Sequence, residues 1–285
     1  MLEEKKLVKN QNDKDFIKAP LPKTIFKYEG SDYKSLINLK SQSIFMASPI
    51  NFNDPYDCSI NCQLNELNNE DISKIKEYYL YKSEISKEQT IGLDEMNSDN
   101  FKALLYNSHS EAQNIIKKSF QETRGVSCFS EVNDELLMWA HYSNKHKGFC
   151  LEFKTSIEPF NKIRKVNYLD GFPKFDPVSL IIEKSNDLLL APYFTKSKRW
   201  NYEKEWRLIH YEGGTLYTYP ANSLKAIYFG PKIDEQFRDL ICLIMCGQNP
   251  DVELYQGDLS KAEFKITFTQ FTYTSLAQGL AKRSL

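Results

Sequence analysis

The sequence predicts an α+β fold built as one large domain, and three observations support this prediction. The stretch from Gly125 to Phe153 carries strand, helix and strand signals in immediate succession. Residues 65–123 are polar, with apolar residues at the three-to-four-residue spacing of amphipathic helices. The part after residue 200 alternates short β-type runs with one more helical pattern. With 285 residues, of which 41% are hydrophobic, the chain is long enough to bury a sizeable core.

The first elements follow a charged lead-in. Residues 1–22 are rich in charge and end in two prolines, so we expect a poorly ordered segment before a domain that spans 23–285. Alternating β-type residues predict strands at 24–28 and 43–47, and the spacing of Leu36 and Leu39 predicts a helix over 31–39 between them.

The loop at 51–57 is dense in Asn, Asp and Pro, which form local turns with their own backbone. One interpretation is a rigid connection. The other is a loop that faces a ligand, because aromatic and polar groups are unusually close together there. The candidate contact residues are Phe52, Asn53, Asp54 and Tyr56.

The helical pattern of residues 65–123 predicts a helical insertion into the domain. Its Ser-, Glu- and Asn-rich stretch at 83–100 predicts a mobile connection between helices. Further along, we expect a short strand at 166–168, a helix at 178–190 after two prolines, and a second helix or turn at 196–199.

The central stretch begins with a predicted strand at 126–129. Asn133 is a suitable N-cap for a helix with a buried face, and Gly148 a suitable left-handed residue at its end. The alternation of Phe149, Leu151 and Phe153 then predicts a half-buried strand.

The C-terminal part begins with an aromatic stretch. Trp206 to His210 alternates as a strand, opened by Glu203 and Glu205 and closed by two glycines. We then expect a strand at 224–229, a helix at 234–245, and strands at 252–255 and 264–268.

Composition points to a soluble cytoplasmic protein. The net charge is -1, from 37 basic and 38 acidic residues, so the overall balance requires neither nucleic acid nor an anionic membrane as partner. The charged N-terminus has no apolar signal core, and no run approaches the roughly 20 apolar residues of a membrane span. We expect the six cysteines to be reduced and no metal to be bound, since the two C-x-x-x-C pairs lack the usual zinc spacing.

Glu203 and Glu205 are the first candidates for chemistry. Two carboxylates at the start of one strand can hold a sugar hydroxyl and orient a nucleophile. Trp200, Tyr202 and Trp206 around them can stack on a flat ligand such as nicotinamide or adenine. The alternative is a pair of solvent-exposed acids bonded to Lys204 or Arg207.

Ser127 and Ser130 flank Cys128 after a strand signal, and their simplest role is to cap the strand end. A nucleophilic Cys128 assisted by His141 or His146 is the alternative. The sequence contains no Walker A, dinucleotide-binding or His-Glu-x-x-His motif.

Three spaced motifs together resemble the bacterial family called domain of unknown function 2971. They are FNDPYD at 52–57, SCFS at 127–130 with WAHY and HKGFCLEF up to residue 153, and WNYEKEWR at 200–207. The resemblance covers about residues 24–260. Members of that family are often found near phage-defence genes, which implies an intracellular defence effector or toxin.

Three strand motifs follow one another along the chain: Lys27-Tyr28, the Ser-rich turn from Ser127 to Ser130, and Glu203-x-Glu205. Their order is similar to the signature of ADP-ribosyltransferases. This resemblance implies a split, mixed or antiparallel sheet with flanking helices, and NAD as substrate. The resemblance implies NAD contacts from Lys27 and Tyr28, although Arg or His is usual at the first position. It implies a pocket lined by Ser127, Ser130 and Tyr142, with Trp200 and Trp206 beside it. Glu205 would be the catalytic acid and Glu203 the residue that activates the target.

The expected function is therefore transfer of ADP-ribose from NAD to a protein or nucleic acid, or hydrolysis of NAD, in a protein that a regulatory partner can control. We expect Glu205→Gln to abolish activity with little change in melting temperature. One alternative is a non-enzymatic sensor or adaptor that binds a phage or host component through the loop at 51–57. Another is a metal-dependent nuclease in which Asp54, Asp57 and Glu152 converge on a divalent cation.

Overall fold

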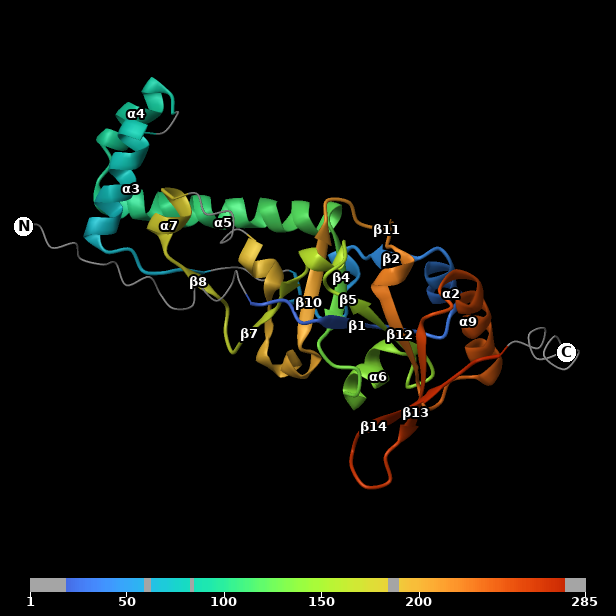
Figure 1. The fold of residues 1–285 in the computed structure, drawn as a ribbon. Coiled ribbons are helices and arrows are strands. Elements are labelled where there is room, and N and C mark those ends of the chain that lie inside the picture. The colour runs from blue at the N-terminus through green and yellow to red at the C-terminus, as the bar shows by residue number, and fades with distance from the viewer. Residues whose placement is uncertain (1–18, 59–62, 83–84, 184–189, 275–285) are drawn as a thin grey trace, which may run out of the picture. The chain divides into compact units, whose positions relative to one another are not determined.

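The computed structural model describes residues 19–58, 63–82, 85–183 and 190–274 (Figure 1). Most of the predicted lead-in at 1–22 lies outside the described residues. The chain divides into two compact units. The first, here the helical unit, comprises Met1–Ala19, Ser48–Arg124 and Asn167–Lys198, and the second, here the sheet unit, comprises Pro20–Ala47, Gly125–Val166 and Arg199–Leu285. The assignment of one domain with an insertion stays a prediction.

The sheet unit is built on an eight-stranded sheet with the order β14-β13-β12-β5-β1-β4-β10-β6. Its strands are β1 Thr24–Glu29, β4 Gly125–Ser130, β5 Phe149–Lys154, β6 Arg164–Lys165, β10 Glu205–His210, β12 Leu224–Phe229, β13 Glu253–Leu259 and β14 Ile266–Phe271. The strands predicted at 24–28, 126–129, 149–153, 206–210 and 224–229 are confirmed. Together with the helices, this mixed and largely antiparallel sheet confirms the α+β class.

One pair of neighbouring strands, β12 and β13, is parallel, and the other neighbouring pairs are antiparallel. The parallel pair is joined by helix α9, Glu235–Gln248, which begins where the Asp234 carboxylate accepts a hydrogen bond from the amide of Phe237. This N-cap satisfies one of the unpaired amides of the first turn. The helix predicted at 234–245 is therefore confirmed.

Strand register divides the sheet's side chains between two faces. Phe26 lies opposite both Ser130 and Glu152, and Ser130 lies opposite Glu205, so these four side chains share one face, here the first face. Their neighbours in sequence point to the other, second face, because successive side chains of a strand alternate.

Helices cover both faces. Helix α6, Leu136–Tyr142, packs on the first face. Helix α2, Tyr33–Lys40, and helix α9 lie on the second face, where Ser35 donates to Glu29 and Phe237 contacts Phe149. A small antiparallel sheet completes the unit, formed by β2, Ser43–Met46, and β11, Thr215–Thr218. The helix at 31–39 and the strand at 43–47 are thus confirmed within two residues.

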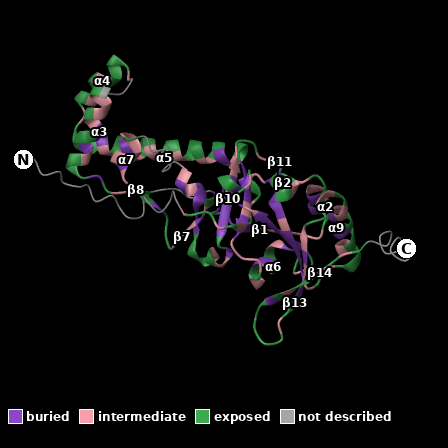
Figure 2. Ribbon diagram, in the orientation of Figure 1, coloured by how far each residue is buried: buried purple, intermediate pink, exposed green. Residues whose placement is uncertain are grey.

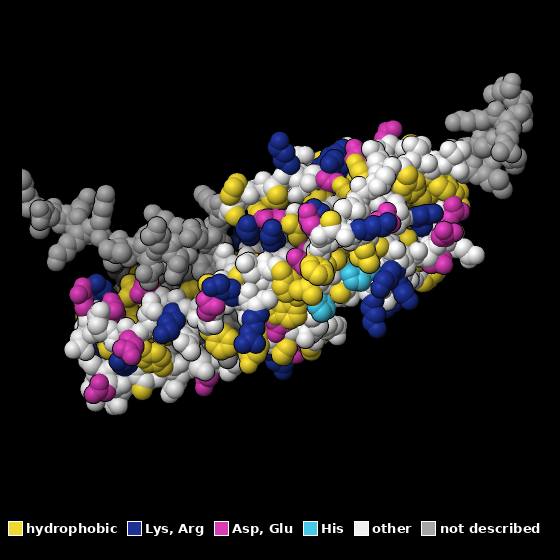
Figure 3. All heavy atoms as spheres, turned by 90° about the horizontal axis from the view of Figure 1, so that it is seen from below, with side chains coloured by type: hydrophobic (Ala, Val, Ile, Leu, Met, Phe, Trp, Pro, Cys, Tyr) yellow, Lys and Arg dark blue, Asp and Glu magenta, His cyan; other side chains and the backbone are white. Residues whose placement is uncertain are grey.

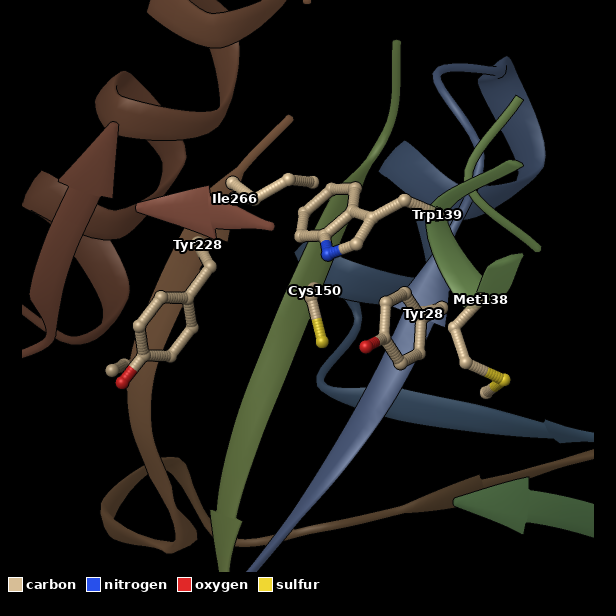
Figure 4. Packing of buried hydrophobic residues seen from close by; sticks show 7 residues of the cluster. Tyr28, Met138, Trp139, Cys150, Tyr228 and Ile266 are labelled. Atoms are coloured by element: carbon tan, nitrogen blue, oxygen red, sulfur yellow. The ribbon is translucent and has the colours of Figure 1, made fainter. Parts of the chain in front are cut away.

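The core of the first face is centred on Trp139 of α6. Its indole lies beside Cys150 of β5 and meets the ring of Tyr28 edge to face, with centroids 5.4 Å apart (Figure 4). The indole nitrogen donates to the carbonyl of Asn133 at 2.6 Å, so its polar end is satisfied. Burial raises the pKa of the Tyr28 hydroxyl well above its ordinary value. Truncating such a side chain typically costs about 3–5 kcal/mol.

The turn after α6 differs from its prediction. Glu135, not Asn133, caps the helix, because its carboxylate accepts from the amide of Leu137 while the carbonyl of Asn133 is occupied by Trp139. Three consecutive residues, 144–146, take the left-handed conformation instead of Gly148. Gly148 is required for a different reason, since a Cβ there would lie 2.0 Å from the carbonyl oxygen of Glu29.

Strand β5 is buried on both faces, with five of its six residues buried. Figure 2 shows the middle of the sheet largely in purple, the colour of buried residues. The prediction of a half-buried strand was therefore wrong. Alternation places Glu152 on the first face of the sheet. Because β5 lies in the middle of the sheet, neighbouring elements cover its side chains on this face as well.

The helical unit contains α3 Asn69–Lys82, α4 Lys87–Asp94, α5 Ser98–Thr123 and α7 Pro177–Ile181. The helices predicted within 65–123 are confirmed. Its core includes Leu67, Ile72, Ile75, Phe101 and Leu105. Two short parallel pairs join it, β3 Gln63–Leu64 with β8 Lys174–Phe175, and β7 Asn167–Leu169 with β9 Thr195–Ser197.

Two predictions in the helical unit were wrong in extent. The predicted connection at 83–100 contains α4, because Ser86 and Gln89 form a capping box that starts a helix in a polar stretch. The helix predicted at 178–190 is α7, which ends at Ile181, and residues 184–189 of that prediction lie outside the described part. Residues 196–199 belong to β9 and to the 3₁₀ helix η4, Lys198–Glu203. Among the helices that the structure describes, none combines the length and the apolar character needed to cross a membrane.

Candidate functional site

The two acids of the WNYEKEWR motif lie at the junction of η4 and β10. Glu205 begins the strand, whereas Glu203 ends the 3₁₀ helix before it, with Lys204 in a left-handed conformation between them. Ser130 holds this junction, since its hydroxyl donates to the carbonyl of Glu203 at 2.6 Å. The side chains are 2% and 3% exposed, so the solvent exposure expected in the alternative interpretation was wrong, whereas its bond to Arg207 is confirmed for Glu205.

Glu205 forms an ion pair with Arg207, two residues along the same face of β10. Arg207 Nε lies 2.6 Å from Glu205 Oε1, and Nη2 lies 3.0 Å from Oε2. Arg207 is 0% exposed. Two parallel hydrogen bonds fix the orientation of the carboxylate and offset the cost of removing both charges from water.

Glu203 is held from α6. The Tyr142 hydroxyl donates to Glu203 Oε1 at 2.6 Å. We call Ser130, Tyr142, Glu203, Glu205 and Arg207 the carboxylate cluster. It joins residues from three segments far apart in sequence.

A row of aromatic rings extends from Tyr142 of the carboxylate cluster. The ring of Trp200 lies 6.0 Å from that of Tyr202 and 6.5 Å from that of His141, and His141 lies 6.1 Å from Tyr142. Trp200 and Tyr202 are half-buried and His141 is exposed. Such rings offer a stacking surface for a flat ligand beside two carboxylates.

The sheet separates the other residues that sequence reasoning assigned to NAD. Lys27, Ser127 and Trp206 point to the second face, away from Glu205. Lys27 lies 3.8 Å from Glu29 and over the ring of Phe129, while the indole nitrogen of Trp206 donates to Glu131 at 2.7 Å.

Tyr28 is on the first face but belongs to the core. Its hydroxyl donates to the carbonyl of Val132 at 2.9 Å, and its side chain packs against Trp139. Of the predicted pocket residues, the structure therefore brings Ser130, Tyr142 and Trp200 together with the two acids.

A further buried carboxylate on the first face, Glu152, has partners that the sequence analysis did not predict. Glu152 is 3% exposed and accepts from Lys225 Nζ and from the Tyr228 hydroxyl, each at 2.8 Å. Burial, and then the bond to Glu152, raises the pKa of Tyr228 well above its ordinary value. A glutamate in an otherwise apolar strand was the available signal, because a buried acid needs a partner.

The loop at 51–57, in the helical unit, is held by its own acids. Asp54 accepts from the amide of Tyr56 at 2.9 Å through its carboxylate and from the amide of Asp57 at 3.0 Å through its carbonyl. Asp57 pairs with Lys196 of β9 at 3.3 Å, with side chains 4% and 5% exposed. These contacts support the rigid connection.

The remaining candidates of that loop are less enclosed. Asn53 is exposed, Phe52 is half-buried, and Tyr56 is 60% exposed with its ring 5.9 Å from that of Phe172. Tyr56 is therefore the side chain of this loop best placed to meet another molecule.

The described residues contain no group of three His, Cys, Asp or Glu side chains arranged to hold a metal ion. The three carboxylates that the nuclease alternative requires have other partners: Asp54 binds backbone, Asp57 binds Lys196, and Glu152 binds Lys225 and Tyr228. The five cysteines in the described part of the chain are thiols outside any disulfide, and burial raises the pKa of Cys242 to about 12.

No curated protein and no solved structure matches the chain. A protein-family comparison does find a match, over residues 138–208. These residues include most of α6, all of β5, Glu203 of η4, and Glu205 and Arg207 of β10. The matched family is described as "Protein of unknown function (DUF2971)", so the resemblance to the domain of unknown function 2971 family is shown over residues 138–208.

Proposed function

We propose that the carboxylate cluster binds NAD and cleaves its bond between nicotinamide and ribose, passing ADP-ribose to a macromolecular acceptor or to water. The observation that carries this proposal is the arrangement of two fixed carboxylates, 203 and 205, beside a tyrosine hydroxyl and half-buried aromatic rings. This chemistry requires negative charge next to a developing ribosyl cation and a flat surface for the leaving base.

In the proposed reaction, the bond between ribose C1′ and the nicotinamide nitrogen breaks, and its electron pair leaves with nicotinamide. The Glu205 carboxylate, oriented by Arg207, stabilises the cationic ribose. Glu203, oriented by Tyr142, accepts the proton of the acceptor nucleophile or water as the new bond to C1′ forms. Trp200 and Tyr202 stack on the nicotinamide or adenine ring.

An ADP-ribosyltransferase-like split sheet is supported by the way β1 leaves β4. The two strands share the single residue pair Phe26 with Ser130, after which Val126 of β4 exchanges hydrogen bonds with Ala47 instead. Lys27 has no role in this proposal, because it lies on the second face.

The acceptor is expected to be a protein or nucleic acid, as for an effector in anti-phage defence. On the face shown in Figure 3, basic and acidic side chains are interspersed. This pattern fits a protein acceptor better than a nucleic acid, for which a cluster of basic residues is typical.

The decisive test compares two tyrosines that make the same kind of bond. Tyr142→Phe removes the hydroxyl that donates to Glu203, and Tyr228→Phe removes the hydroxyl that donates to Glu152, another buried carboxylate of the first face. Nicotinamide release from NAD is measured with cell lysate as the source of acceptors. We expect Tyr142→Phe to slow release about tenfold, less than the roughly 100-fold low end for a group that itself transfers the proton, because Tyr142 only orients Glu203. Tyr228→Phe should leave release near wild type.

Glu203→Gln and Glu205→Gln complete the test. Losing a charge that stabilises a transition state typically costs on the order of 100-fold or more in rate. Because Arg207 depends on Glu205, that variant is expected to lower the melting temperature as well, which revises the expectation from sequence. Glu203→Gln keeps an acceptor for Tyr142 and is the cleaner variant. The proposal fails if folded wild-type protein releases no nicotinamide with lysate present.

A sensor or adaptor is the second candidate, favoured by the exposure of Tyr56 on a rigid loop. It predicts that Tyr56→Ala abolishes partner binding while Glu203→Gln has no effect on it.

A further inference from the structure

The helical unit contains a cavity of about 300 Å³ along the middle of α5. This volume is at the lower limit of pockets that bind small molecules. Its apolar walls include Phe175 of β8, Leu180 of α7 and Tyr193 of the 3₁₀ helix η3, Ala191–Phe194. The cavity lies between two packed ends of α5: Leu105 belongs to the core at one end, and Phe120 stacks on Tyr193 at 3.4 Å at the other.

One wall of the cavity is polar. Ser108, His109, Gln113 and Lys117 recur at helical spacing along α5, so they line the same side of it. The described wall residues include Lys117 and His109 as basic groups and no Asp or Glu. Lys117 is half-buried, where a charge interaction is weakened less by solvent than at the open surface.

We propose that this cavity binds a small amphipathic anion, with its ring or short alkyl body against Phe175, Leu180 and Tyr193 and its anionic head at Lys117. The volume excludes a helix or a folded partner. The apolar walls favour a ring or alkyl body, and the charge of the polar wall selects a negative head over a positive one. The site is in the helical unit, shares no residue with the carboxylate cluster, and would allow the protein to respond to a small metabolite.

Two dyes test this proposal on the full chain. Anilinonaphthalene sulfonate carries an aromatic body and one negative charge, and N-phenylnaphthylamine is nearly the same body without the charge. We expect saturable binding of one molecule of each dye per chain, measured by fluorescence titration. Lys117→Ala should weaken the anionic dye about fivefold, the size expected for one charge contact, and leave the neutral dye unchanged.

The neighbouring lysine is the matched control. Lys118 is 76% exposed, pairs with Glu122 and is not part of the wall, so Lys118→Ala should change neither dye. If Lys117→Ala and Lys118→Ala had the same effect on the anionic dye, the assignment of the anionic head would be wrong.

A second pair of variants locates the dye. Both Ala112 and Ala103 are exposed residues of α5, but Ala112→Phe adds a ring to the cavity wall, whereas Ala103→Phe adds it outside the wall. We expect Ala112→Phe to abolish binding of both dyes and Ala103→Phe to preserve it, with both variants retaining the helical circular dichroism of wild type. Failure of wild type to bind either dye, or equal binding by the two phenylalanine variants, would overturn the proposal.

Discussion

Two buried ion pairs, Glu205 with Arg207 in the sheet unit and Asp57 with Lys196 in the helical unit, come from two of the motifs that sequence analysis marked as functional. They differ in what surrounds them. The pair of β10 lies beside a second buried carboxylate, a tyrosine hydroxyl and half-buried aromatic rings. The pair of the loop lies beside backbone hydrogen bonds that close a turn.

The comparison shows that a buried charge in a motif is not by itself evidence of a reactive site. A buried ion pair can have a purely structural role, because removing one partner leaves the other charge uncompensated in a medium of low dielectric constant. Chemistry has to be inferred from additional groups around the pair, such as the tyrosine hydroxyl and the second carboxylate beside Glu205.

The largest expected effect is that of Arg207→Met on stability. It leaves Glu205 buried without its bidentate partner, which typically costs about 3–5 kcal/mol. Denaturant unfolding monitored by circular dichroism measures this loss, and Arg199→Met, at an exposed position, is the control. A loss below about 1 kcal/mol would mean that water reaches Glu205 in solution.

Lys196→Met sharpens the comparison in the helical unit. Asp57 then loses its partner, and we expect a loss of about 3 kcal/mol, at the lower end of the range for buried pairs because its 3.3 Å contact is longer than that of Arg207. The control is Lys198→Met, which breaks an exposed pair with Asp170 and should cost no more than a few tenths of a kcal/mol. Equal effects of the two substitutions would show that the pair of Asp57 is effectively exposed.

The next effect is a pH dependence of stability caused by Glu131. This residue follows β4 and accepts a hydrogen bond from Trp206 of β10. Burial alone would raise the pKa of this carboxyl, but hydrogen bonds from Lys165 and Trp206 outweigh it, so the pKa lies below its ordinary value of 4.5. The folded state therefore favours the ionised form. Its stabilisation is present above pH 4.5 and is lost as the pH falls below 4.5 through the lowered pKa.

Glu131→Gln tests this assignment. As the pH is lowered from about 5 to 3, the range in which a glutamate titrates, the melting temperature of the variant should fall less than that of wild type. Glu135→Gln is a control on the same segment that does not contact Trp206. Identical acid sensitivity in wild type and Glu131→Gln would contradict the role of the carboxylate.

The smallest expected effect is at the loop. Tyr56→Ala removes a side chain that is 60% exposed, so stability should change by less than about 0.5 kcal/mol. A larger loss in thermal unfolding would show that the contact between the tilted rings of Tyr56 and Phe172 stabilises the helical unit.

Much of the local structure followed from the sequence. Strand β12 was predicted at its observed residues, and the strands β1, β4, β5 and β10 within one residue at each end, because period-two alternation depends on neighbours in sequence. Boundaries were less well predicted where polar caps decided them, as at Ser86 and Glu135, since several nearby residues could serve as cap.

The candidate site was predicted only in part. Sequence named Glu203, Glu205, Ser130 and Tyr142, but it also placed Lys27, Ser127 and Trp206 in the same pocket. It offered Arg207 as a partner of the acids only together with solvent exposure, and it did not foresee that Glu152 would be buried with Lys225 and Tyr228. Those outcomes depend on which strands are neighbours and on their register, and a shift of one residue would exchange the two faces.

By itself, therefore, the sequence determined most of the strands and helices, the resemblance of residues 138–208 to a family, and the presence of two acids next to aromatic residues. Tertiary structure alone decided which side chains share a face, which acids are buried, and which cation each one meets. The physical reason is that alternation and capping act over a few residues, whereas burial and ion pairing arise where strands distant in the chain come together.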